Sequence, residues 1–119
     1  MAKRPTKCIS VSAAKVMHAK WISTRATPIA EAIGSEDTRD FVYSVAELQE
    51  FLDYVKDESV KLGVDNPGVR IYFAAYSADD SNKATVFLSA TNGSDSNSPN
   101  NYDIDPFNVG TGGWPPNVY

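Results

Sequence analysis

Four residues able to hold a ligand alternate along two runs that read as β-strands. Arg70, Tyr72 and Tyr76 lie two or four positions apart in the first run, and Phe87 lies in the second. Side chains two apart share one face of a strand, so these groups would gather on one side of a hairpin. That face is neither a solvated surface nor an apolar interior, which suits binding. We predict binding there and assign no catalytic residue.

Two interpretations of this face stay open. In one, the first helix or the C-terminal tail covers it as a second core layer, with Arg70 paired to an acid. In the other, it is open and binds a protein or a small ligand. A pocket would enclose Arg70 without a carboxylate partner, whereas an interaction face would leave Tyr72 and Phe87 flat and exposed.

A second candidate group lies near the N-terminus. Trp21 and Arg25 follow two lysines and form the best anion-binding candidate of the basic segment. His18 is the only histidine, and no catalytic triad can be assigned from sequence order. The alternative function is therefore a small-ligand or anion-binding protein, or an enzyme, with one pocket near Arg70, Tyr72, Tyr76, His18 and Trp21.

No motif specifies a cofactor or a metal. Asp103 and Asp105 begin like a calcium loop, but Phe107 stands at the third ligand position. The glycines at 110–113 precede two prolines and open no helix, which argues against a phosphate loop. Cys8 is the only cysteine, so disulfides within the chain are excluded. We expect no metal and no cofactor.

Length and composition predict a single domain. The chain has 119 residues, of which 42% are hydrophobic and 22% charged, a range in which one core forms. No stretch approaches the length of a membrane span, and residues 1–8 lack the apolar stretch of a signal peptide. We expect one domain over 1–119 with an N-terminal extension at 1–9, in the cytoplasm and without a membrane partner.

Charge is divided unevenly along an acidic chain. Residues 1–39 hold seven Lys/Arg against three acids, or +4, and the net charge of −4 leaves −8 for residues 40–119. Phosphate binding needs a positive field, so a nucleic-acid partner is not expected at the acidic hairpin segment. Either the opposite poles screen each other, or they attract partners or further copies of the chain.

The fold class that these patterns predict is α+β. Residues 69–76 and 84–91 form a hairpin whose alternating apolar positions should face the core. We predict that paired residue numbers sum to 159, with Phe73 opposite Val86 and Tyr72 opposite Phe87; a sum of 161, which keeps the same faces, is the alternative. A short strand at 41–43 would join the same sheet, making it mixed, if it pairs in parallel.

Two helices should pack on this sheet, over residues 13–22 and 45–62. The first has Ser12 as its N-cap. The second starts with the capping box Ser44 to Glu47, ends at Gly63, and carries an apolar stripe from Val45 to Leu62. The polar tail at 92–119 keeps large apolar residues at intervals, which predicts an ordered, irregular strap laid over the domain or a neighbour.

Three segments resemble a known group of sequences. They are Pro67–Tyr76, Ala84–Leu88 and Gly112–Pro116, which together read PGVRIYFAAY, ATVFL and GGWPP. This pattern resembles a group of small bacterial proteins of the Bacteroidetes type, to which no activity is assigned. The resemblance implies a bacterial source and carries over no functional residue.

These patterns favour a non-catalytic protein-interaction or assembly domain. It would use the aromatic sheet face and the strap, and its partner would be another protein or further copies of the chain. The binding residues we select are Arg70, Tyr72, Tyr76, Phe87, Trp21 and Arg25.

Overall fold

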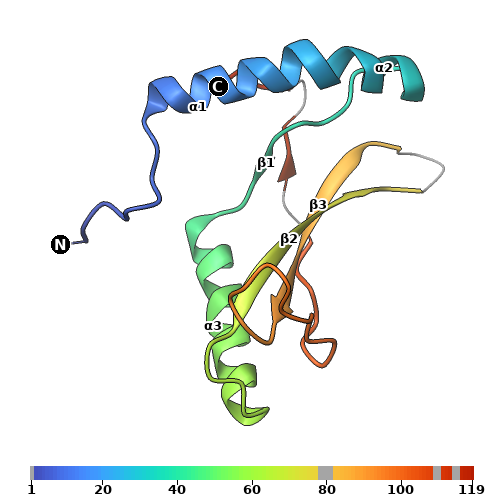
Figure 1. Ribbon diagram of the computed structural model, residues 1–119. Coiled ribbons are helices and arrows are strands. Elements are labelled where there is room, and N and C mark those ends of the chain that lie inside the picture. Colours follow the sequence, from blue (N-terminus) through green and yellow to red (C-terminus); the bar gives the residue numbers. More distant parts are fainter. Residues whose placement is uncertain (1, 78–81, 109–110, 114–115) are drawn as a thin grey trace. The chain divides into compact units, whose positions relative to one another are not determined.

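The computed structural model describes residues 2–77, 82–108, 111–113 and 116–119 of an α+β chain (Figure 1). The acids of the hairpin turn, Asp79 and Asp80, and the ring of Trp114 lie outside these residues. The chain divides into an N-terminal unit, Met1–Asp37 with Pro116–Tyr119, and a sheet unit, Thr38–Pro115. Its elements are α1 (Val11–Trp21), a π-helical segment η1 (Ile22–Ala26), α2 (Thr27–Ile33), β1 (Phe41–Val42), α3 (Val45–Lys61), β2 (Gly68–Ala75), β3 (Ala84–Thr91) and β4 (Thr111–Gly112).

The hairpin of the sheet unit has the predicted register. Strands β2 and β3 pair antiparallel from Gly68 opposite Thr91 to Ala75 opposite Ala84, so every paired sum is 159. Tyr72 therefore faces Phe87, as expected. The period of two in the side chains excludes even sums, because a slip by one residue would exchange the two faces, and of the two odd sums considered the structure has 159 and not 161.

The strap continues the sheet beyond β3. Leu88 and Phe107 exchange both backbone hydrogen bonds, at 2.8 and 2.9 Å, and Thr91 forms a bridge with Asn100. The amide of Asn101 also donates to the Ala90 carbonyl at 2.9 Å. Over residues 100–107 the tail therefore contacts β3 at both ends, with a turn between Asn101 and Ile104, so it is ordered and irregular, as predicted, but not extended throughout.

The core lies between α3, β3 and the strap. Its buried apolar residues are Phe51, Val55, Leu88, Ala90 and Ile104, and Phe107 packs against them with its ring stacked 4.9 Å from that of Phe51. The prediction that the whole apolar face of the hairpin is core is wrong at β2. Ile71 and Phe73 are 66% and 85% exposed. The buried face of α3 packs with β3 and the strap, which leaves these two β2 side chains outside the core.

Helix α3 begins and ends where the sequence predicted. The Ser44 hydroxyl accepts from the Glu47 amide at 2.9 Å, and Gly63 has φ of 75°, the left-handed geometry that favours glycine after a helix. The buried stripe differs from the predicted one. It runs through Phe51, Val55 and Ser59, whereas Val45 is exposed.

Strand β1 lies in a separate pair. Phe41 and Val42 pair antiparallel with Gly112 and Thr111 of β4. The option of a mixed sheet, with this strand parallel to β2, is therefore wrong, and the hairpin sheet is antiparallel.

In the N-terminal unit, helical backbone runs without a break from Val11 to Ile33. Its N-cap is Ser10, whose hydroxyl accepts from the Ala13 amide at 3.0 Å, so the predicted Ser12 cap is wrong by two residues. Thr27 precedes Pro28, a position at which helical geometry is disfavoured, yet Thr27 has φ of −66° and ψ of −51°. The wider π turn before Pro28 leaves space for its ring. No helix among the described residues could span a membrane.

Candidate functional site: the Arg70 face and the β2 edge

The structure brings together four of the six selected residues. Arg70, Tyr72, Tyr76 and Phe87 come from the two strands of the hairpin, and the register places the three from β2 and its end on the same face as Phe87. We call this surface the Arg70 face. Trp21 and Arg25 belong to the N-terminal unit.

Trp21 and Arg25 contact each other. The guanidinium carbon of Arg25 lies 5.7 Å from the centre of the Trp21 ring, which is a cation–π distance. In the same unit the Nε2 atom of His18 is buried and has no hydrogen-bond partner within the described part of the chain. A single pocket that unites these residues with Arg70 stays a prediction.

Arg70 holds the strap onto the sheet. Its Nη1 donates to the Asn100 side-chain oxygen at 2.6 Å, and its Nη2 donates to the carbonyls of Ser96 and Ser98 at 3.0 and 2.8 Å. Arg70 forms no ion pair with a described carboxylate. Hydrogen bonds from a charged donor are stronger than neutral ones, so three of them commit this side chain to the strap.

The aromatic pair on this face is also bound to the strap. The Tyr72 and Phe87 rings stack with centres 5.0 Å apart, and the Asn100 amide donates to the Tyr72 hydroxyl at 2.7 Å. Asn100 therefore joins Arg70 and Tyr72 through its oxygen and its nitrogen. Of the two interpretations of this face, these bonds support coverage by the strap, with carbonyl and amide oxygens in place of the expected acid.

A second polar cluster lies at the far end of the hairpin, around Asn108. Its amide donates to the Val86 carbonyl at 2.8 Å and to the Thr85 hydroxyl at 3.2 Å, and the Tyr43 hydroxyl donates to its backbone carbonyl at 3.0 Å. Burial, and then the charge of a nearby Tyr76, raise the pKa of Tyr43 above its ordinary value of 10.0.

The Tyr43 hydroxyl should make stability depend on pH in alkali. A pKa that is raised in the folded state means that the fold holds the proton more tightly, so this stabilisation is complete below pH 10 and is lost as the pH rises through the folded pKa. Tyr43→Phe should cost about 0.5–1.5 kcal/mol at neutral pH through the lost hydrogen bond. Its urea midpoint should then fall less steeply above pH 10 than that of the wild type.

The matched control for this prediction is Tyr102→Phe. Tyr102 is exposed on the strap, so its variant should follow the wild-type curve throughout. Parallel alkaline curves for the wild type and Tyr43→Phe would contradict the assignment of the raised pKa to a hydroxyl held by the fold.

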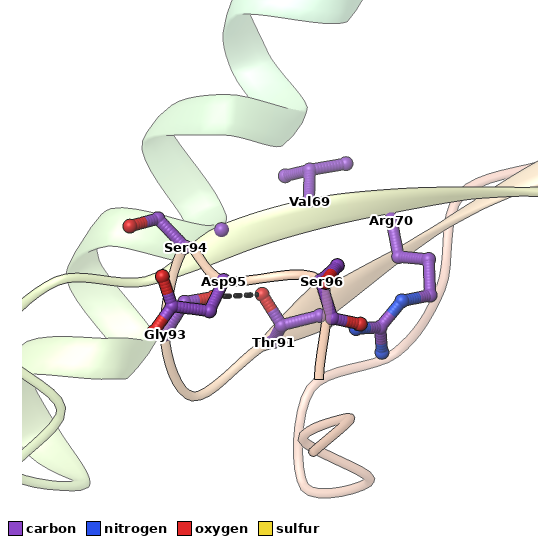
Figure 2. A pocket seen from close by; sticks show the side chains of 8 residues that line it. Val69, Arg70, Thr91, Gly93, Ser94, Asp95 and Ser96 are labelled. Carbon is purple, nitrogen blue, oxygen red and sulfur yellow. Dashed lines mark hydrogen bonds between the residues drawn. The ribbon is translucent and has the colours of Figure 1, made fainter. Parts of the chain in front are cut away.

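Two shallow pockets flank the strap. The first, of about 460 Å³, lies between the start of β2 and the loop Gly93–Ser96, and Arg70 forms part of its wall (Figure 2). An added Cβ at Gly68 would approach the Thr91 hydroxyl to 2.6 Å, so this strand end needs glycine. The second pocket, of about 330 Å³, is lined by Tyr72, Phe87 and strap residues.

Chemistry in these pockets is limited. Asp95 lines the first pocket together with Arg70, so its wall carries both charge signs. The described residues contain no cluster of three or more His, Cys, Asp or Glu side chains that could hold a metal ion. The two pockets therefore supply hydrogen-bonding groups and aromatic stacking surfaces. Arg70, the charged donor of the first pocket, already donates its hydrogen bonds to the strap.

The opposite edge of the hairpin has different properties. The Tyr76 amide donates to Lys83 across the hairpin at 3.0 Å, and in an antiparallel ladder the groups that face the partner alternate. The even-numbered residues of β2 therefore face β3, and the odd-numbered ones face away. Among the described residues β2 pairs only with β3, so the N–H and C=O groups of Val69, Ile71 and Ala75 form an open edge.

Sequence reasoning missed the residues that decide which face is covered. Asn100, Asn108 and Ile104 lie in a tail without periodicity, and nothing local distinguishes the two bonded asparagines from their neighbours. The one usable signal was the spacing of Ile104 and Phe107, two large apolar residues in a polar segment. It predicted an ordered strap but not the strand that it pairs with.

Comparisons with protein-family models, with curated proteins and with solved structures found no match for this chain. The resemblance to Bacteroidetes-type proteins stays a prediction.

Proposed function

We propose that this chain is a non-catalytic protein-interaction module that binds an extended segment along the open edge of β2. The observation that carries the proposal is the edge itself. It is a strand of eight residues without an internal proline, and its neighbouring side chains Ile71 and Phe73 are exposed. Long apolar edges of this kind accept an added strand, and natural proteins commonly shield them when they have no partner.

The state of the Arg70 face supports the choice of this edge. Its arginine and its asparagine partner are bound within the chain, and Tyr72 stacks on Phe87 beneath the strap. A partner that used this face would first have to displace those bonds. The β2 edge offers backbone donors and acceptors without such a cost, and the side chains beside it supply apolar contact.

The test uses a variant that removes a single outward donor. The Ile71 amide points away from β3, so Ile71→Pro deletes that donor while the hairpin ladder keeps its bonds. Random nonapeptides displayed on phage are selected on the full chain and counter-selected on this variant. We expect peptides with alternating apolar residues, which slow amide exchange at Val69, Ile71 and Ala75.

The control is Val60→Thr, which removes an apolar side chain that is similarly exposed, on α3, far from the strand edge in sequence. The selected peptides should bind it as they bind the wild type. Peptides that bind Ile71→Pro equally well, or that leave the three amides unprotected, would overturn the proposed function.

A further inference from the structure

The loop that leads from β3 into the strap begins with a chemically labile dipeptide. Asn92 directly follows the last residue of β3 and is the only asparagine of the chain that precedes a glycine. Asparagine is one of the thermolabile residues, because the backbone nitrogen of the next residue can attack its side-chain carbonyl and close a five-membered ring. A following glycine has no side chain to obstruct that attack.

The fold leaves both reacting groups of this dipeptide free. The Asn92 side chain is exposed, and it makes no hydrogen bond within the described part of the chain. The Gly93 amide donates to no acceptor in the same ranges. The groups beside them are engaged instead. The Asn92 amide donates to the Pro99 carbonyl at 3.0 Å, and the Gly93 carbonyl accepts from the Thr91 hydroxyl at 2.6 Å (Figure 2).

Other asparagines of the sheet unit lack one of these conditions. Asn97 is exposed in the same loop, but the amide that follows it, of Ser98, donates to the Asp95 carbonyl at 3.0 Å. Asn66 precedes Pro67, whose nitrogen carries no hydrogen. The two bonded asparagines of the strap have side chains that are held by hydrogen bonds. The requirements for ring closure therefore meet at Asn92.

We propose that Asn92 is a site of spontaneous deamidation in the folded chain. The Gly93 nitrogen loses its proton and bonds to Cγ of Asn92, the Cγ–Nδ2 bond breaks, and ammonia leaves, which produces a succinimide ring. Water then opens the ring. Attack at Cγ gives aspartate with the original main chain, and attack at the main-chain carbonyl carbon gives isoaspartate, whose main chain runs through the side-chain carbons. Water is the only co-reactant, and nothing is oxidised or reduced.

The products change the start of the strap. Both add a negative charge to a unit with twelve acidic and five basic residues, and isoaspartate also adds a methylene group to the main chain. That extra length moves the Gly93 carbonyl relative to the Thr91 hydroxyl. The carbonyls that accept from Arg70, those of Ser96 and Ser98, lie in the same loop. Deamidation should therefore slowly loosen the segment that covers the Arg70 face.

Peptide mapping of the full chain by mass spectrometry, during incubation at neutral and mildly alkaline pH, is the first test. We expect aspartate and isoaspartate at position 92, the latter confirmed by labelling with an isoaspartate-specific methyltransferase. Conversion should be faster at the higher pH, because the attacking nitrogen must lose its proton. Asn97 is the internal control and should convert at least about tenfold more slowly. Equal conversion at the two positions would refute the assignment to Asn92.

Two comparisons test the contribution of the fold and of the ring. Asn92→Gln keeps an exposed amide but needs a six-membered ring, so ammonia release at this position should fall at least about tenfold. The wild type in urea gives the conversion rate without the fold, and the folded rate should lie within about tenfold of it. An Asn92 that converts in urea but stays intact in the folded chain would overturn the proposal.

Amide exchange tests the effect on the strap. Anion exchange collects the converted chain, and NMR follows the Asn101 amide, which donates to the Ala90 carbonyl. This amide should exchange faster in chains that contain isoaspartate than in Asn92→Asp, which has the added charge and a normal main chain. Equal exchange in the unmodified, converted and Asn92→Asp chains would contradict the loosening of the strap. None of these readouts depends on peptide binding at the β2 edge.

Discussion

Ile104→Ala should lower the free energy of unfolding of the sheet unit by about 3 kcal/mol, as expected for removing a large aliphatic side chain from a core. Ile104 is 2% exposed and belongs to the same buried cluster as Phe51 and Leu88, although it lies in the polar tail. The cluster is small, so the cavity cannot easily be filled by its neighbours. The loss is measured by urea denaturation, with unfolding monitored by far-UV circular dichroism.

Tyr102→Ala is the matched control, because Tyr102 is two residues away and 88% exposed. Truncation of an exposed side chain away from any special contact should change stability by no more than about 0.5 kcal/mol. If both variants lost equal stability, the tail would act through its general composition and not through one buried anchor.

Arg70→Ala should cost about 2–3 kcal/mol, because it removes three hydrogen bonds from a charged donor and leaves their acceptors without it. The loss should be local. The amides of Asn92 and Asn101, which donate from the strap side to Pro99 and Ala90, should exchange faster, while amides within α3 should change less. Amide exchange followed by NMR distinguishes this release of the strap from global loosening.

Arg70→Lys provides the comparison that separates charge from geometry. A lysine keeps the positive charge but lacks the planar fork that reaches several acceptors at once, so it should recover only part of the lost stability. Lys56→Ala removes an exposed cation from α3 and should have little effect. Stability of Arg70→Ala equal to that of the wild type would show that the strap is held by its apolar residues alone.

Local patterns predicted the elements that depend on local chemistry. The serine cap and the glycine end of α3 follow from side-chain hydrogen bonding and backbone freedom, and the two faces of the hairpin follow from a period of two. The N-cap of α1 was misplaced because Ser10 and Ser12 are both serines before a helical run. At Pro28 a local rule failed, since a π turn accommodates a ring that an α turn would not.

The covered and open surfaces of the hairpin could not be assigned from sequence. Ile71 and Leu88 face each other across the strands and look equivalent as sequence positions, yet Leu88 is buried and Ile71 is not. The difference arises because the strap pairs beside β3 and completes the core there. The strap is distant in sequence and aperiodic. The strand edge that it pairs with depends on tertiary contacts, which local sequence propensities do not report.

The pairing of the strap with β3 determines when the sheet unit can fold during synthesis. Tyr43 and Asn108 are 65 residues apart, and Arg70 and Asn100 are 30 apart, so the contacts that close this unit are among the last to be translated. Until Phe107 has left the ribosome, the nascent hairpin has two unpaired edges and an exposed Leu88. Such an intermediate is prone to aggregate, and slow folding of this unit would be a property of its topology.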